Sequence, residues 1–230
     1  MLDVAGLNAW YGEGQALRDV SFRAAPGEVV TLVGRNGAGK TTALRCVMGL
    51  HRAMNGSIRF GDADLAALGP VRRARLGLGY VPDDRGIYAT LTVQEHLILP
   101  PKARDADWDL PRVYAAFPAL RERRAQIASK LSGGEQQMLA IARVLRMGAR
   151  VLLLDEPTEG LAPILVEQVA AILRDAKAEG RTVLLVEQNL RFATAVADRH
   201  YLLSQGTIVA ALGNDEVRSR ESELRHHLGI

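Results

Sequence analysis

The sequence predicts an α/β fold with a parallel β-sheet at its core. Three apolar runs rich in β-branched residues carry this prediction, at residues 29–33, 151–154 and 182–186. Each run is continuous rather than alternating, which indicates a strand buried on both faces, as in a parallel sheet covered by helices. Helical patterns follow or separate these runs, at residues 38–48, 135–146 and 164–178.

The regions outside this core have different patterns. Three short segments joined by Gly and Pro turns resemble strands and predict an antiparallel β-lobe, at residues 2–4, 20–23 and 57–60. Residues 91–130 contain prolines and a charged helix-like end but no strong strand, so we expect an inserted helical subdomain there. We expect a single domain over residues 1–230, with the core and β-lobe at 1–82 and 151–230 and the inserted region at about 83–150.

Composition excludes several classes of protein. With 48% hydrophobic and 24% charged residues, the chain is not mainly disordered. The single cysteine, Cys46, excludes an internal disulfide framework and favours a reducing compartment. The apolar runs are shorter than the ~20 residues that a membrane-spanning helix needs, and the first residues show no secretory signal.

The charge pattern does not indicate a nucleic-acid partner. The formal net charge is only +3, and nucleic-acid binding would require a basic patch or stripe. Two arginine-rich clusters, at residues 72–75 and 121–124, lack interleaved aromatic residues. We expect these clusters to form solvated helix faces, and we expect no nucleic acid among the partners.

A glycine-rich segment follows the first predicted core strand and precedes a predicted helix. It matches G-x-x-x-x-G-K-[ST], the phosphate-binding loop. Glycines let successive N–H groups face an anion, and the helix N-terminus favours negative charge there. Lys40 would reach the terminal phosphates and the Thr41 hydroxyl would bind Mg²⁺. The expected nucleotide-binding residues are Gly34, Arg35, Asn36, Gly37, Ala38, Gly39, Lys40, Thr41 and Thr42.

Two acidic residues follow the second predicted core strand. Asp155 and Glu156 would lie at the carboxyl edge of the sheet, where ligands bind in open α/β folds. We expect Asp155 to hold Mg²⁺, directly or through a water molecule, and Glu156 to orient or deprotonate the attacking water. A solvent-facing acidic pair is the alternative, and the preceding phosphate loop makes it less favoured.

A second anion-binding helix start is predicted between these motifs. Ser132 can cap the helix that follows, and the adjacent glycines free backbone N–H groups. The segment consists of Leu131, Ser132, Gly133, Gly134 and Glu135. Considered alone, an ordinary capped helix is the better interpretation.

In order and spacing, the three motifs resemble those of ABC transporter nucleotide-binding subunits, over essentially the whole chain. The resemblance implies an ABC-type P-loop NTPase with a RecA-like core that binds ATP and Mg²⁺. It also implies a head-to-tail dimer, in which the 131–135 segment of one chain closes on the ATP of the other. An aromatic residue near the N-terminus would stack on adenine; Tyr11 stands at that place, and Trp10 is its nearest competitor.

The sequence departs from the general ABC pattern at three positions. The usual Gln before the helical subdomain is replaced by Asp83, or by Asp84 in an alternative alignment. A carboxylate there can still bind Mg²⁺ or its water. The usual His after the third core strand is replaced by Gln188, which can donate a hydrogen bond but cannot become charged. The resemblance therefore implies a catalytic set of Lys40, Glu156 and Gln188, while the acidic residue usual near position 162 is an alanine.

Three runs of sequence narrow the resemblance, at residues 131–139, 155–163 and 186–189. They resemble the LivF-type ATPases of bacterial branched-chain amino acid importers. The resemblance implies two transmembrane permease subunits, a second ABC ATPase or a homodimer, and indirectly a periplasmic solute-binding protein. It also implies a peripheral location on the cytoplasmic face of the inner membrane. Importers of urea or short amides share the pattern and stay an alternative.

Two other functions compete with transport. A soluble ABC-type protein acting on nucleic acid or ribosomes usually carries two cassettes or a long coiled-coil insertion, and this sequence has neither. A small-molecule kinase with a phosphate loop would leave the 131–135 segment without a role. We therefore expect an ATPase that drives solute import.

Overall fold

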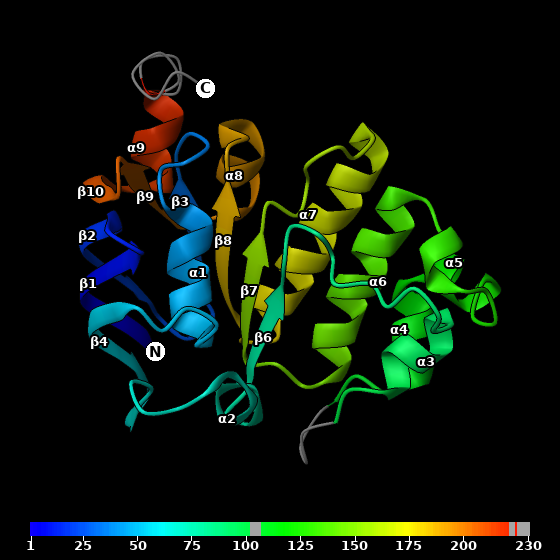
Figure 1. The fold of residues 1–230 in the computed structure, drawn as a ribbon. Helices are drawn as coiled ribbons and strands as arrows, with labels where there is room; N and C mark the ends of the chain where they lie inside the picture. The colour runs from blue at the N-terminus through cyan, green and yellow to red at the C-terminus, as the bar shows by residue number, and fades with distance from the viewer. Residues whose placement is uncertain (102–106, 221–223, 225–230) are drawn as a thin grey trace.

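In the computed structural model, which describes residues 1–101, 107–220 and 224, two β-sheets enclose one helix and further helices cover the outer face (Figure 1). The strands are β1 (Leu2–Tyr11), β2 (Gly14–Ala24), β3 (Val29–Val33), β4 (Met54–Phe60), β5 (Ala63–Asp64), β6 (Leu78–Val81), β7 (Val151–Asp155), β8 (Thr182–Glu187), β9 (Arg199–Ser204) and β10 (Thr207–Gly213). The helices are α1 (Lys40–Met48), α2 (Pro70–Arg75), α3 (Val93–Ile98), α4 (Leu110–Ala116), α5 (Pro118–Glu122), the 3₁₀-helix η1 (Ala128–Lys130), α6 (Gly133–Arg146), α7 (Pro163–Ala178), α8 (Leu190–Val196) and α9 (Asn214–Ser219).

The central sheet has the order β10-β9-β3-β8-β7-β6. Its strands are parallel except β10, which pairs antiparallel with β9. The three predicted core strands are confirmed as β3, β7 and β8, and every residue in them is buried. Burial on both faces explains why their sequences are continuously apolar.

Three strands of this sheet were not predicted from the sequence. β6 is only four residues long, and β9 and β10 mix polar and apolar residues. The buried His200 of β9 shows how a polar side chain fits in such a strand. Nδ1 of its ring lies 2.7 Å from the Thr31 hydroxyl oxygen, and Nε2 lies 3.0 Å from Oδ1 of Asn214. Both ring nitrogens are therefore paired although the residue is buried.

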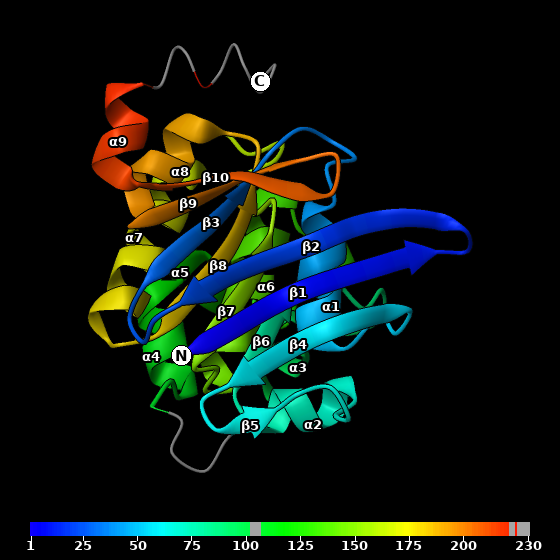
Figure 2. The same ribbon diagram turned by 90° about the vertical axis from the view of Figure 1, so that its left-hand side faces the viewer.

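The predicted antiparallel lobe is confirmed as a sheet of order β2-β1-β4-β5, with strands longer than expected. Figure 2 shows β1, β2 and β4 as a layer in front of the parallel sheet, with α1 beside them. Buried side chains from the lobe, α1 and the central sheet form one apolar cluster. This packing places the start of α1 beside the tips of β1 and β2.

Helices α6 and α7 cover the opposite face of the central sheet, and α3, α4 and α5 lie beyond them (Figure 1). Helix α3 begins with a capping box: the Thr92 hydroxyl accepts from the Glu95 N–H, and the Glu95 carboxylate accepts from the Thr92 N–H. Residues 102–106 of the predicted helical region lie outside the described part of the chain. Among the described residues, none of the helices combines the length and apolar character needed to span a bilayer.

The prediction that residues 72–75 form a solvated face is wrong for one residue. Arg73 is only 2% exposed, whereas Arg72 and Arg75 are exposed. The carbonyls at the C-terminal end of α1 need donors, and the planar guanidinium supplies several from one side chain. It donates to the carbonyl oxygens of Cys46, Val47, Leu65 and Leu68.

Candidate functional site

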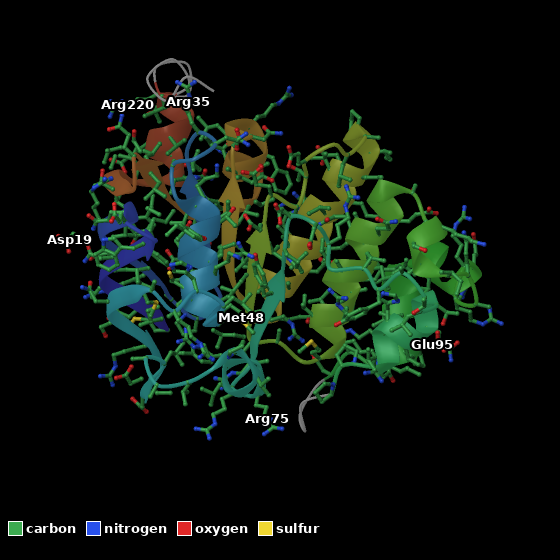
Figure 3. All side chains as sticks on the ribbon, viewed as in Figure 1. Asp19, Arg35, Met48, Arg75, Glu95 and Arg220 are labelled. Atoms are coloured by element: carbon green, nitrogen blue, oxygen red, sulfur yellow. The ribbon has the colours of Figure 1, made fainter. Side chains whose placement is uncertain are left out.

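The predicted site residues follow the carboxyl ends of neighbouring parallel strands. The phosphate loop follows β3, the acidic pair lies at the end of β7 and directly after it, Gln188 follows β8, and Asp83 lies after β6. Figure 1 shows these strand ends at one edge of the sheet, and Figure 3 places the labelled Arg35 at that end of the molecule, opposite Arg75. Segments far apart in the sequence therefore meet where α/β proteins bind ligands.

The phosphate loop requires glycine at positions where the backbone packs closely. A Cβ at Gly34 would lie 2.2 Å from the Leu203 carbonyl oxygen. Gly39 has φ +105°, and a Cβ there would lie 2.6 Å from the Leu17 side chain. Both contacts hold the loop against strands of the two sheets, which fixes the start of α1.

Lys40 is the first residue of α1 and its side chain is almost fully buried. Its ammonium donates to the carbonyl oxygens of Gly34, at 2.8 Å, and Arg35, at 3.1 Å. The same nitrogen lies 3.1 Å from Oε1 of Glu156. The phosphate loop therefore wraps around a cation that is already paired with the acidic residue after β7.

Glu156 contacts both other residues of the predicted catalytic set. Its Oε1 contacts Lys40, and its Oε2 accepts a 3.0 Å hydrogen bond from Nε2 of Gln188. Its backbone has φ +46°, a conformation uncommon for a residue other than glycine. Such strain persists only where the surroundings over-determine it and is concentrated at functional sites.

Asp155 lies beside the Thr41 hydroxyl, which donates to its Oδ1 at 3.0 Å. Burial raises the pKa of Asp155 to about 6, and the charge of Asp83 adds to this effect. Hydrogen bonds from Thr41 and Tyr80 act in the opposite direction and lower the pKa. The Asp83 charge acts on Asp155, whereas the Asp84 carboxylate accepts from the Gly86 N–H in a turn. Two carboxylates and a hydroxyl are hard oxygen ligands of the kind that Mg²⁺ prefers.

Tyr11 lies at the mouth of a cavity of about 280 Å³ beside the phosphate loop. Its side chain is 51% exposed and its ring lies 4.5 Å from the His51 ring, centroid to centroid. Trp10 does not line this cavity, so the geometry favours Tyr11 over its competitor. The cavity is lined by Tyr11, Ala16, Asn36, Gly37, Gly39, Lys40, Thr41, Thr42 and Glu156. A neighbouring cavity of about 330 Å³ is lined by Arg35, Asn36, Gly37, Ala38, Leu203, Ser204 and Gln205.

The 131–135 segment forms the capped start of α6. The Ser132 hydroxyl accepts from the Glu135 N–H, and Oε2 of Glu135 accepts from the Ser132 N–H at 2.9 Å. A Cβ at Gly134 would lie 2.1 Å from the end of the Leu165 side chain, so α6 packs closely on α7 there and Leu165 would have to shift to admit a larger residue. Of the described residues, those that line the phosphate-loop cavity include none from this segment. The structure therefore does not bring the two motifs together within one chain.

Two residues at the site were not predicted from the sequence. The Tyr80 hydroxyl donates to Oδ2 of Asp155 at 3.2 Å, and Glu187, the last residue of β8, is only 3% exposed. Tyr80 lies in the short strand that the sequence pattern did not reveal. Glu187 does leave a signal, because it is a charged residue directly after a continuous apolar run.

The burial of Glu187 predicts a pH-dependent stability. Burial raises its pKa from 4.5 to about 7, and the neighbouring Glu156 charge adds to this while hydrogen bonds from Thr158 and Asn189 oppose it. A raised carboxyl pKa stabilises the fold at low pH, and the effect is lost as pH rises through about 7. Glutamine cannot ionise, so the variant does not lose this stability. We therefore expect the free energy of unfolding of Glu187→Gln, minus that of wild type, to increase by about 3 kcal/mol from pH ~4.5 to ~8.

Denaturant unfolding of both proteins across this pH range measures that difference. Glu159→Gln, at an exposed position three residues after Glu156, serves as the control. A Glu187→Gln difference in stability that does not change with pH would show that Glu187 does not titrate abnormally.

A phosphate loop after β3, whose lysine contacts the acidic residue after β7 with β8 lying between the two strands, defines a P-loop nucleotide hydrolase. The glycine pair at the start of α6 adds the feature that distinguishes the ABC class. A family model described as "ABC transporter" matches residues 17–159. The chain belongs to this family: it is an ABC ATPase with a nucleotide-binding fold.

Curated relatives match the chain over nearly its full length. BraG of Pseudomonas aeruginosa, a high-affinity branched-chain amino acid transport ATP-binding protein, is 43% identical over 95% of this chain and 97% of its own. LivF of Archaeoglobus fulgidus, a probable branched-chain amino acid transport ATP-binding protein, is 37% identical over 100% of this chain and 99% of its own. LptB of Acidithiobacillus ferridurans, the ATP-binding protein of a lipopolysaccharide export system, is 36% identical over 94% of this chain and 92% of its own.

Solved structures match the whole fold. An ATP-binding subunit of an ABC transporter superposes with a TM-score of 0.87 at 28% identity, covering 100% of both chains. A dimeric bacterial ABC transporter cassette superposes with a TM-score of 0.80 at 25% identity, covering 93% of this chain and 99% of the other. These likenesses confirm the expected ABC ATPase fold.

Proposed function

We propose that this chain is the ATP-hydrolysing subunit of an importer for branched-chain, hydrophobic amino acids. The contact of Glu156 with both Lys40 and Gln188 carries the hydrolytic part of the proposal. The substrate is supported by the 43% identity with BraG, whose name states that transport. The LptB relative favours a second candidate, an exporter of lipopolysaccharide type, and an importer of urea or short amides is a third.

The chemistry follows from the positions of the side chains. When nucleotide enters, the Lys40 ammonium would exchange part of its present contacts for the terminal phosphates and offset their charge. Glu156, freed on one oxygen, would accept the proton of the attacking water as a general base. Gln188 would hold the other oxygen of Glu156 with its amide. Mg²⁺, which offsets phosphate charge when bound, would be held by Thr41, Asp155 and Asp83.

The separation of the two motifs within one chain supports a dimer as the working unit. Residues 131–135 of a second ATPase, or of a second copy, would cover the ATP bound at Lys40 of the first. We further propose that two permease subunits anchor this pair at the cytoplasmic face of the inner membrane, with a periplasmic binding protein supplying the solute. Within the chain, residues 83–150 would form the helical subdomain and the remaining residues the core.

Tyr11 should contribute to adenine binding. Stacking of a base on an aromatic side chain is worth about 1–3 kcal/mol, so we expect Tyr11→Ala to weaken ATP binding about tenfold and Tyr11→Phe to leave it unchanged. Trp10→Ala is the matched control because Trp10 does not line the cavity. Titration with ATP and with inorganic triphosphate, which has no base, measures the effect. Equal losses for both ligands would contradict stacking.

Co-purification from gently solubilised native membranes tests the assembly. We expect a tagged chain to recover a second ATPase and two multi-span permeases, with uptake of a labelled branched-chain amino acid lost when the chain is deleted. Recovery of lipopolysaccharide export components would favour the second candidate. Ribosomes or soluble enzymes without membrane proteins would exclude transport.

A further inference from the structure

Glu187 places a buried carboxyl group beside the hydrolytic site. Glu187 is only 3% exposed and is the last residue of β8, whose other residues are all buried. Burying a carboxylate is costly unless it is hydrogen-bonded, and an apolar residue would continue the strand pattern. A buried acid at such an edge is a candidate for a role in the site rather than in the core.

Each oxygen of Glu187 holds a different loop. Oε1 accepts a 2.7 Å hydrogen bond from the hydroxyl of Thr158, which is itself 7% exposed. Oε2 accepts from the N–H of Asn189 at 3.2 Å. Thr158 lies two residues after Glu156, and Asn189 directly follows Gln188. The carboxyl group therefore ties the loop after β7 to the loop after β8.

These two loops also meet at Glu156. The parallel register pairs Asp155 of β7 with Val186 of β8, and the Glu156 N–H donates to the Val186 carbonyl at 3.0 Å. The Gln188 amide donates to Glu156 from the second loop. Because Glu156 has a positive φ, its position depends on neighbours that hold the loop. The bond between the Thr158 hydroxyl and the Glu187 carboxylate is a second side-chain link between these segments, beside that of Gln188 with Glu156.

We propose that Glu187 is a positioning residue for ATP hydrolysis, which holds Glu156 against Gln188 by bridging Thr158 and Asn189. The inference rests on the proposed function, through the roles given to Glu156 and Gln188. Glu187 does not line the phosphate-loop cavity, so its loss should lower kcat without weakening nucleotide binding. A misplacement of about 1 Å at a reacting group can cost on the order of 100-fold in rate.

Four variants, tested in the full chain with the assembly that co-purifies with it, separate this role from a general effect on folding. Thr158→Val and Glu187→Ala remove the bridge, and we expect kcat to fall at least tenfold with ATP affinity unchanged. Thr158→Ser keeps the hydroxyl. Glu187→Gln can accept from Asn189 through its carbonyl oxygen and donate to Thr158 through its amide. We expect both conservative variants to stay within threefold of wild type.

The double variant Thr158→Val with Glu187→Ala should be no slower than the slower single variant, because both remove one bridge. Thr194→Val is the matched control: it removes a buried hydroxyl that donates to the Arg191 carbonyl, away from Glu187, and should leave kcat unchanged.

The outcomes distinguish this inference from the proposed function. If Glu156→Gln abolishes hydrolysis but Thr158→Val and Glu187→Ala stay within twofold of wild type, the positioning role of Glu187 is overturned and the function stands. Multiplicative losses in the double variant, or reduced ATP affinity in both single variants, would also overturn it. If Glu156→Gln hydrolyses ATP at the wild-type rate, the proposed function and this inference both fail.

Discussion

Replacing Glu156 by glutamine should reduce ATP hydrolysis at least 100-fold while leaving ATP bound. The amide keeps the size of the side chain and can still pair with Lys40 through its oxygen, but it cannot accept a proton from water. General-base catalysis contributes about 10²–10⁴ in rate. Steady-state phosphate release and equilibrium ATP binding measure the two properties separately.

Glu159→Gln is the matched control for this variant. It makes the same chemical change three residues later, at an exposed position, and should hydrolyse ATP at the wild-type rate. We also expect Glu156→Gln to prolong the life of the ATP-bound dimer, because hydrolysis is the step that would release it. Wild-type turnover by Glu156→Gln would exclude this residue as the base.

Replacing Lys40 by alanine should weaken ATP binding by about 30-fold or more. The change removes a buried cation that would contact the terminal phosphates, and losing one partner of such a pair costs about 2–5 kcal/mol. The change also removes the partner of Glu156, whose side chain is only 14% exposed. The unpaired carboxylate would then repel the phosphates of the incoming ATP. Binding of ATP and of AMP, measured in parallel, should show a large loss for ATP alone.

Lys177→Ala is a suitable control for the charge change. Lys177 forms a partly exposed ion pair with Asp198 at the end of α7, away from the phosphate loop. Its removal should leave ATP affinity within twofold of wild type. Unchanged ATP affinity in Lys40→Ala would contradict the assignment of the phosphate site.

The local motifs were predictable because each is a continuous stretch with one physical cause. The run at 29–33 is apolar because β3 is buried on both faces, and the following glycines are required by backbone contacts such as that of Gly34 with Leu203. Ser132 and Glu135 form the capping box that their spacing predicts. The sequence also showed that Asp83 and Gln188 depart from the general ABC pattern, although it could not show which residues these two side chains contact.

The elements that the sequence did not reveal are those whose residues are mixed in polarity. β9 begins with Arg199 and the buried His200, whose partners Thr31 and Asn214 come from other segments. Arg73 looked like part of a charged surface, and only the carbonyls gathered around it explain its burial. In each case a distant partner satisfies a polar group, and no local pattern records that partner.

By itself, the sequence determined the α/β class, the phosphate loop, the acidic pair and the capped start of α6, because each depends on residues within a few positions of one another. Three features come from the tertiary structure alone: Lys40 and Gln188 contact separate oxygens of Glu156, Tyr11 rather than Trp10 lines the cavity, and residues 131–135 lie away from it. Those facts depend on the order in which β3, β8 and β7 pair. Pairing between strands far apart in the sequence, such as β3 and β8, is set by the packing of the whole chain, not by its local sequence.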